Sequence, residues 1–197
     1  MQTYIYFIRH GEVYNPKRIL YERLPRFGLS DKGKQQLQKT AEFLKGKDID
    51  ALYSSPLLRA RQSAKIVKNN LGISPLHISK QITEVKTSYQ GRNYSEFDAL
   101  QSQVYLKPLK KTDETIMQIA ERMQEFIKKI TKKYKGKHIA LVSHGDPIMI
   151  VKALSENKEL TFYNFKTKPY VQHGEIYQLT IDDKGTFEIK SIFKPQV

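Results

Sequence analysis

Tyr4-Ile5-Tyr6-Phe7-Ile8-Arg9-His10-Gly11-Glu12 is the stretch of sequence that decides the fold. Its first five residues are β-branched or aromatic and the run is too short for a helix, so it predicts a buried strand. The strand ends at a basic pair followed by glycine. Open α/β sheets bind ligands in the crevice beyond the carboxyl ends of their strands, and Arg9 and His10 would lie there.

A second stretch, Ile139-Ala140-Leu141-Val142-Ser143-His144-Gly145-Asp146, has the same order of an apolar run and a His-Gly pair. Two strands that both end in His-Gly would bring His10 and His144 to one crevice. A third pair, His173-Gly174, follows residues 169–172, which do not form an apolar run. We therefore expect His173 to lie outside the site.

The length and composition indicate a single globular domain over residues 1–197. Hydrophobic residues make up 39% of the 197 residues, which is ordinary for a soluble protein. No apolar run approaches the roughly 18 residues that span a bilayer, and the N-terminus lacks a signal-peptide pattern, so we expect a cytoplasmic protein with no membrane partner. The absence of cysteine excludes disulfides, thiolate metal sites and cysteine nucleophiles.

The net charge of +14 favours anionic partners, among them nucleic acids and phosphorylated metabolites. Lysines concentrate in residues 107–111 and 128–137, and in the second segment they alternate with apolar residues at helical spacing. That pattern is typical of a solvated helix face. Because no nucleic-acid-binding motif accompanies it, we favour the solvated face over a nucleic-acid partner.

Regular elements alternate along the chain. Periodicity and end signals predict helices over residues 31–45, 56–71, 114–134 and 147–154, and further strands over 51–54, 76–79, 175–181 and 186–193. Ser30, Ser55 and Asp146 are expected helix caps. Residues 82–112 are the least regular and are predicted to form an inserted cap region. Strands that alternate with helices indicate an α/β sandwich.

Arg59 also belongs to the candidate site, because it lies in the first turn of a helix that directly follows a strand. Helix N-termini favour anions, and guanidinium groups bind phosphate oxygens in bidentate fashion. Together with Arg9, His10 and His144, it would form a pocket for a dianion.

Three motifs, Arg9-His10-Gly11-Glu12, the run from Ser54 to Ala60 that contains Arg59, and Ser143-His144-Gly145, stand in the order of the histidine phosphatase superfamily, also called phosphoglycerate mutase-like. The resemblance covers nearly the whole chain. It implies a three-layer α/β/α sandwich with a mostly parallel central sheet. Residues 11–16 and 20–25 resemble a bacterial phosphatase-type subgroup rather than the mutases.

The resemblance implies a phosphomonoesterase that acts on a small phosphorylated metabolite. His10 would attack phosphorus and become a phosphohistidine, which water then hydrolyses. Arg9, Arg59 and His144 would hold the phosphoryl oxygens. Because these side chains meet the charge of the phosphate, we expect neither a metal nor another cofactor.

The resemblance also suggests further site residues. Glu84 matches the general acid of the family, although the Gly-rich, Trp-containing stretch that usually follows it is absent here. Glu96 is the alternative acid. Asn15 matches a phosphate-contacting Asn, and Arg23 could reach a second anionic group on the substrate.

Three other functions compete with a metabolite phosphatase. A phosphoglycerate mutase would need longer covering segments, and a protein-phosphohistidine phosphatase would lack the inserted region 82–112. A non-catalytic binder of RNA or another anionic partner would not need the complete set of His and Arg residues. The substrate and the oligomeric state stay open at this point.

Overall fold

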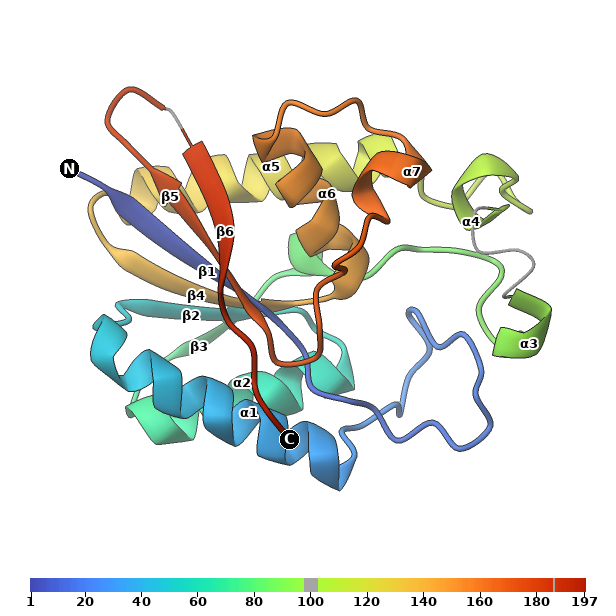
Figure 1. The fold of residues 1–197 in the computed structure, drawn as a ribbon, viewed down its shortest axis with the longest axis horizontal. Helices are drawn as coiled ribbons and strands as arrows, with labels where there is room; N and C mark the ends of the chain where they lie inside the picture. The colour runs from blue at the N-terminus through green and yellow to red at the C-terminus, as the bar shows by residue number, and fades with distance from the viewer. Residues whose placement is uncertain (98–102, 186) are drawn as a thin grey trace.

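A computed structural model describes residues 1–97, 103–185 and 187–197. Its centre is one six-stranded sheet with the strand order β3-β2-β4-β1-β5-β6 (Figure 1). The strands are β1 (Thr3–Arg9), β2 (Ala51–Ser54), β3 (Leu76–Ile78), β4 (His138–Ser143), β5 (Ile176–Ile181) and β6 (Phe187–Phe193). β3, β2, β4 and β1 are parallel neighbours, whereas β5 and β6 are antiparallel. The prediction of a mostly parallel sheet is confirmed.

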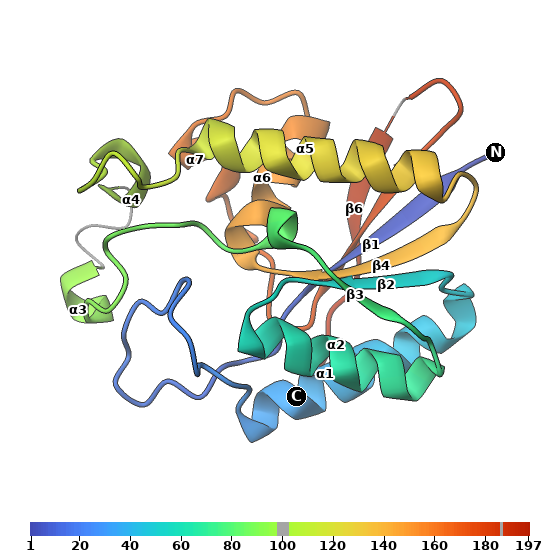
Figure 2. The same cartoon turned by 180° about the vertical axis from the view of Figure 1, so that it is seen from behind.

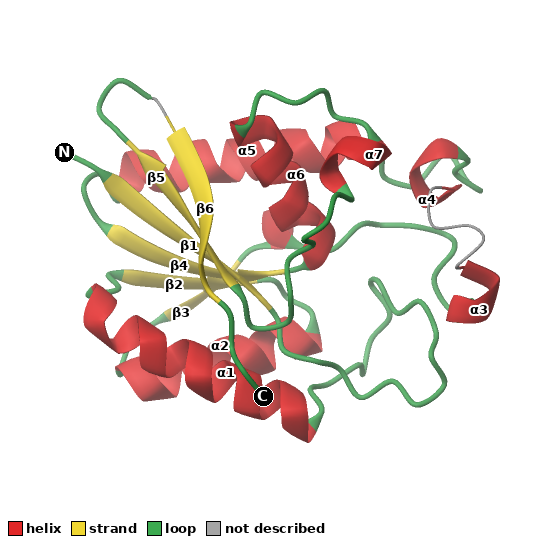
Figure 3. Ribbon diagram, in the orientation of Figure 1, coloured by secondary structure: helices red, strands yellow, loops and turns green. Residues whose placement is uncertain are grey.

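Helices cover both faces of the sheet. α1 (Asp31–Leu44) and α2 (Leu58–Leu71) lie against one face, and α5 (Ile116–Lys133) and α6 (Gly145–Ser155) lie against the other (Figure 2). Five short helices complete the described elements: η1 (Lys45–Lys47), η2 (Lys80–Ile82), α3 (Tyr94–Phe97), α4 (Gln103–Leu106) and α7 (Phe162–Phe165). The predicted three-layer α/β/α sandwich is therefore confirmed, and Figure 3 shows the strands enclosed between the two helical layers.

The apolar run of β1 is explained by burial on both sides. Ile5 and Phe7 pack in the core beneath α5 and α6, while Tyr6 and Ile8 pack in the core formed with α1 and α2. A strand covered on both faces needs apolar residues at every position instead of every second one. Each such buried side chain stabilises the fold by about 1.5–3 kcal/mol.

The lysine-rich helix α5 separates its residues into two faces. Met123, Phe126 and Ile130 are buried in the core, whereas Lys128 and Lys132 are exposed. The lysine pattern thus forms a solvated helix face, as its spacing predicts. None of the helices within the described residues is long and apolar enough to cross a membrane.

Two of the predicted helix caps are wrong. Ser30 does cap α1, because its hydroxyl accepts from the backbone N–H of Gly33. Ser55, however, lies before α2, whose cap position is Leu57, and Asp146 lies inside the first turn of α6. The side chains of Ser55 and Asp146 contact groups of the candidate site instead, and those contacts decide their positions.

Two irregular segments run together beyond the carboxyl ends of the parallel strands. The backbone N–H of Leu20 donates to the carbonyl of Arg92 (2.8 Å), and that of Tyr94 donates to the carbonyl of Arg18 (2.7 Å). Loop 13–29 is thereby tied to the predicted cap region 82–112, of which residues 98–102 lie outside the described part. In Figure 1 these segments and α3 lie at the side of the molecule opposite the N-terminus.

Candidate active site

The parallel strands bring their polar ends to one edge of the sheet. β1 and β4 pair in register from Tyr4 with His138 to Arg9 with Ser143, so His10 and His144 follow at the same level. The backbone N–H of His10 donates to the carbonyl of Ser143 (3.1 Å). The two imidazole rings lie 5.2 Å apart between centroids, which confirms that the two His-Gly motifs meet.

The hydrogen bonds of His10 fix its tautomer. Nδ1 lies 2.8 Å from the carbonyl oxygen of Gly11, which can only accept, so the ring proton is on Nδ1. Arg59 Nε donates to Nε2 of His10 (3.1 Å), so that nitrogen presents its lone pair. Burial, together with the nearby Arg59, lowers the pKa of His10 well below its usual value. His10 is therefore a neutral imidazole with an unprotonated Nε2 at neutral pH.

Close backbone packing holds the loop that carries His10. At Gly33, a Cβ atom would lie 2.1 Å from the carbonyl oxygen of Glu12, so only glycine fits there. The backbone N–H of Gly11 donates to the hydroxyl of Ser63 on α2, and that of Glu12 donates to the side chain of Gln36 on α1. Helices α1 and α2 thus fix the position of the imidazole.

Both predicted arginines lie at the site. Arg59, which is only 1% exposed, lies over the ring of Tyr21 and donates through Nη2 to the carbonyl of Glu22 (2.6 Å). Arg9 donates through Nη1 to the carbonyl of Val171 (2.7 Å). These contacts orient each guanidinium, and each keeps a buried nitrogen, Nε of Arg9 and Nη1 of Arg59, that has no partner within the described part of the chain.

Ser55 is a site residue that sequence reasoning assigned to a helix cap. Its hydroxyl lies 2.7 Å from Nε2 of His144. Because a hydroxyl can donate to that nitrogen, it allows His144 to carry its proton on Nδ1, which has no hydrogen-bond partner among the residues that the structure describes. Burial and the nearby Arg59 lower the pKa of His144 well below its usual value.

The expectation that His173 lies outside the site is wrong. Its ring lies 5.5 Å from that of His10, and burial lowers its pKa to about 2. The segment before it is not a strand, but the backbone N–H of Gly174 donates to the carbonyl of Arg9 (2.9 Å) and so brings His173 to the end of β1. The third His-Gly pair is the feature of the sequence from which a place for His173 in the site could have been predicted.

Unpartnered buried polar atoms gather around His10. Within the described residues six buried side-chain nitrogen or oxygen atoms have no hydrogen-bond partner, and four belong to this cluster: Arg9 Nε, Arg59 Nη1, His144 Nδ1 and His173 Nε2. Buried polar groups are almost always paired, so these four mark a binding site for a ligand. Two of the atoms can only donate and the other two can do so, which suits the oxygens of a phosphoryl group.

A cavity of about 360 Å³ opens beside Arg9 and His10. Glu84, the predicted general acid, lines it, and so does Glu22, which sequence reasoning missed. Burial raises the pKa of Glu84, with Asp146 adding to the shift, and burial together with Glu84 raises that of Glu22 well above its usual value. A raised pKa favours the protonated carboxyl, which can donate a proton to a leaving group.

Asp146 closes one side of this cavity. Its carboxylate accepts from the hydroxyls of Tyr105 and Tyr170 and pairs with Lys166. These three partners, all from the segments that cover the sheet edge, explain why the side chain points into the site rather than capping α6.

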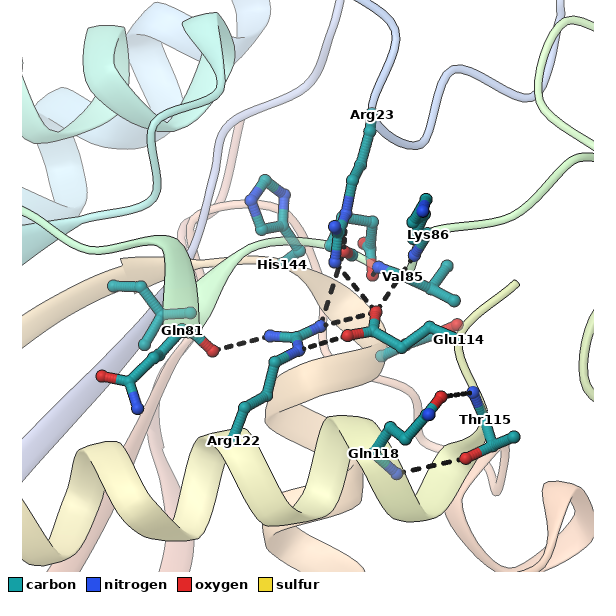
Figure 4. Close-up of polar contacts among 12 residues, drawn as sticks. Arg23, Gln81, Val85, Lys86, Glu114, Thr115, Gln118, Arg122 and His144 are labelled. Atoms are coloured by element: carbon teal, nitrogen blue, oxygen red, sulfur yellow. Dashed lines mark hydrogen bonds and ion pairs between the residues drawn. The ribbon is translucent and has the colours of Figure 1, made fainter. Parts of the chain in front are cut away.

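Arg23 belongs to a charged cluster with Glu114 and Arg122 that contacts the backbone of Glu84. Its Nε donates to the carbonyl of Glu84 (2.7 Å) and its Nη2 pairs with Glu114 (2.9 Å). Arg122 contacts the same carboxylate (2.7 Å), the carbonyl of Gln81 (2.6 Å) and the carbonyl of Glu84 (3.5 Å). Figure 4 shows the two guanidinium groups converging on Glu114. Arg23 thus holds the Glu84 segment and does not line the cavity.

Asn15 and Glu96 also lie apart from the cavity lining. The Asn15 side chain hydrogen-bonds to both the carbonyl and the N–H of Ile19, which closes its own loop. Glu96 is exposed on α3. Of the two candidate acids, the structure therefore brings Glu84 and not Glu96 to His10.

Comparison with known proteins agrees with this geometry. A sequence model of the histidine phosphatase superfamily (branch 1) matches residues 5–193. Phosphoglycerate mutase-like protein 4 of Arabidopsis thaliana is 30% identical over 155 residues, which are 73% of this chain and 67% of the plant protein. The structure of YhfR from Bacillus stearothermophilus superimposes with a TM-score of 0.86 at 20% identity, covering 98% of both chains. That of a mycobacterial glucosyl-3-phosphoglycerate phosphatase superimposes with a TM-score of 0.82 at 18% identity, covering 100% of both.

Proposed function

The chain belongs to the histidine phosphatase superfamily (branch 1) and is a phosphatase, and from this premise we propose that it hydrolyses a small phosphate monoester through a phosphohistidine on His10. The unprotonated Nε2 of His10, surrounded by four unpartnered buried nitrogens, carries the proposal. A neutral imidazole is a competent nucleophile, and the donors around it lie where negative charge would gather.

In the first step, Nε2 of His10 attacks phosphorus and the bond from phosphorus to the leaving oxygen breaks. The N–H groups of Arg9, Arg59 and His144 stabilise the charge on the three non-bridging oxygens, which supplies most of the catalysis in such transfers. His173 adds a further nitrogen to this subsite. Arg59 Nε, which donates to Nε2 of His10 in the free site, would donate to the phosphoryl group instead.

The leaving alkoxide takes a proton from Glu84. Burial raises the pKa of this carboxyl, which favours the protonated form that can donate. In the second step, the ionised Glu84 accepts a proton from water while the water attacks the phosphohistidine. His10 is then released as a neutral imidazole and phosphate departs.

We propose that the reaction needs no metal ion, because Arg9 and Arg59 supply the positive charge that a divalent cation supplies elsewhere.

The experiment that tests the proposed function is hydrolysis of p-nitrophenyl phosphate in excess chelator by wild type, His10→Ala and His77→Ala. His77 lies on β3 against Tyr53, away from the cavity, and serves as the matched control. We expect chelator-resistant activity in wild type and His77→Ala and a loss of several orders of magnitude in His10→Ala. Unchanged activity in His10→Ala would reject the proposal.

A further inference from the structure

The leaving-group side of the cavity has an apolar and aromatic wall. Beyond Arg9 and His10, its uncharged lining consists of Leu20, Tyr21, Val85, Tyr94, Val104, Tyr105 and Tyr170. The volume of about 360 Å³ equals the space of about a dozen water molecules. After a phosphoryl group is placed at His10, space remains in the cavity for an organic leaving group.

Besides Arg9, the charged groups on this wall are three carboxyls and two lysines. Glu22, Glu84 and Asp146 line the cavity, and the cations besides Arg9 are Lys166 and Lys168. Lys166 is paired with Asp146 and lies over the ring of Tyr170 (4.9 Å). Lys168 is exposed at the rim. Apart from Arg9, which would hold the phosphoryl group, no buried, unpaired cation among the described lining residues therefore faces the leaving group.

Arg23 is the side chain that could have supplied a further cation to the cavity wall. It comes from the loop next to the cavity, yet its guanidinium contacts Glu114 and the carbonyl of Glu84. Figure 4 shows it directed into that cluster together with Arg122. A substrate with a second anionic group would consequently find carboxyls where it needs a cation.

The pKa shifts of Glu22 and Glu84 indicate that the cavity disfavours a buried negative charge. Burial and neighbouring carboxyls raise the pKa of both Glu22 and Glu84, which means that the site favours their uncharged forms. A carboxylate on a substrate would meet the same desolvation and the same neighbours. An uncharged group, in contrast, can hydrogen-bond to a protonated carboxyl or a tyrosine hydroxyl.

We infer that this enzyme selects monoesters whose leaving alcohol is uncharged, and that it discriminates against esters with a second anionic group, such as phosphoglycerates. The inference rests on the proposed function and deepens it. It also separates the chain from a mutase, which must bind the carboxylate of a phosphoglycerate.

A matched pair of ligands tests the inference without relying on catalysis. Carbamoylbenzylphosphonate and carboxybenzylphosphonate, both para-substituted, have the same shape and differ in one negative charge, and neither can be hydrolysed. Isothermal titration with wild type should show the neutral amide binding more tightly by roughly tenfold or more, because a carboxylate buried there loses its hydration without gaining an ion pair. Equal affinity, preference for the carboxylate, or binding of neither ligand would overturn the inference.

Variants of the lining residues test which side chains cause the difference in affinity between the amide and the carboxylate ligand. Asp146→Asn removes the carboxylate that pairs with Lys166, which leaves a cation on the wall, and should narrow the ratio of the two affinities. Glu121→Gln, an exposed change on α5, should leave that ratio unaltered. A preference for the carboxylate that disappears in Lys168→Gln would identify Lys168 as an anion receptor and contradict the inference. Hydrolysis of p-nitrophenyl phosphate, measured alongside, shows separately whether the proposed phosphatase activity holds.

Discussion

Arg122 offers the sharpest test of how the Glu84 segment is held. Arg122→Met keeps the length of the side chain but removes its contacts to Glu114 and to the carbonyls of Gln81 and Glu84. Breaking a buried ion pair costs about 3–5 kcal/mol. Arg122 and Glu114 are each 14% exposed and Arg23 still pairs with Glu114, so we expect a loss nearer to about 2–3 kcal/mol.

Thermal unfolding measures this loss directly. For a chain of this size, about 2–3 kcal/mol corresponds to a decrease in Tm of roughly 4–12 °C. The control is Lys34→Met, which removes the exposed pair with Asp31 and should leave Tm unchanged. Arg122→Met should also lose more activity toward phenyl phosphate, whose phenol is a poor leaving group, than toward p-nitrophenyl phosphate, because Glu84 is less firmly positioned in this variant. An unchanged Tm in Arg122→Met would refute this account of the cluster.

Three further predictions follow from the site. Glu84→Gln should lower kcat for phenyl phosphate by roughly 10²–10⁴-fold and that for p-nitrophenyl phosphate far less, and equal losses would argue against an acid role. Gly33→Ala should destabilise the fold by about 1–3 kcal/mol, because its Cβ meets the carbonyl of Glu12, while Gly46→Ala meets nothing within 4 Å and should be tolerated in the same denaturation assay. Burial lowers the pKa of His173 in the folded chain to about 2, whereas in the unfolded chain it has its ordinary value of 6.5. As the pH falls below 6.5, only the unfolded chain binds a proton at His173, so the free energy of unfolding decreases. His173→Gln should therefore reduce the loss in unfolding free energy between pH 7.5 and 5.5 by about 1.4 kcal/mol, and an identical loss in both proteins would contradict this assignment.

Patterns local in the sequence predicted the framework of the site well. The apolar run of β1 and that of β4 identify two buried strands, and parallel pairing then brings His10 and His144 together. Arg59 was predictable for the same reason, because a helix that follows a parallel strand begins at the same edge of the sheet.

Contacts between distant residues could not be predicted from the sequence. Arg23 points toward Glu114, which lies 91 residues later, and so it holds the Glu84 segment instead of the substrate. Ser55 and Asp146 have the residue types of helix caps, but partners from other segments engage their side chains. His173 reaches the site on an irregular loop, which is positioned by hydrogen bonds from Gly174 to the carbonyl of Arg9 and from Thr40 to the carbonyl of Gly174.

The phosphoenzyme is the most direct test of the central claim. Wild-type protein mixed with a phosphate monoester is quenched in alkali, where phosphohistidine is stable, and its intact mass and peptide map are recorded. We predict one added phosphoryl group on His10, lost on acidification, and none in His10→Ala. Turnover with no phosphorylated enzyme at any time, or a phosphoryl group on another residue, would contradict the account.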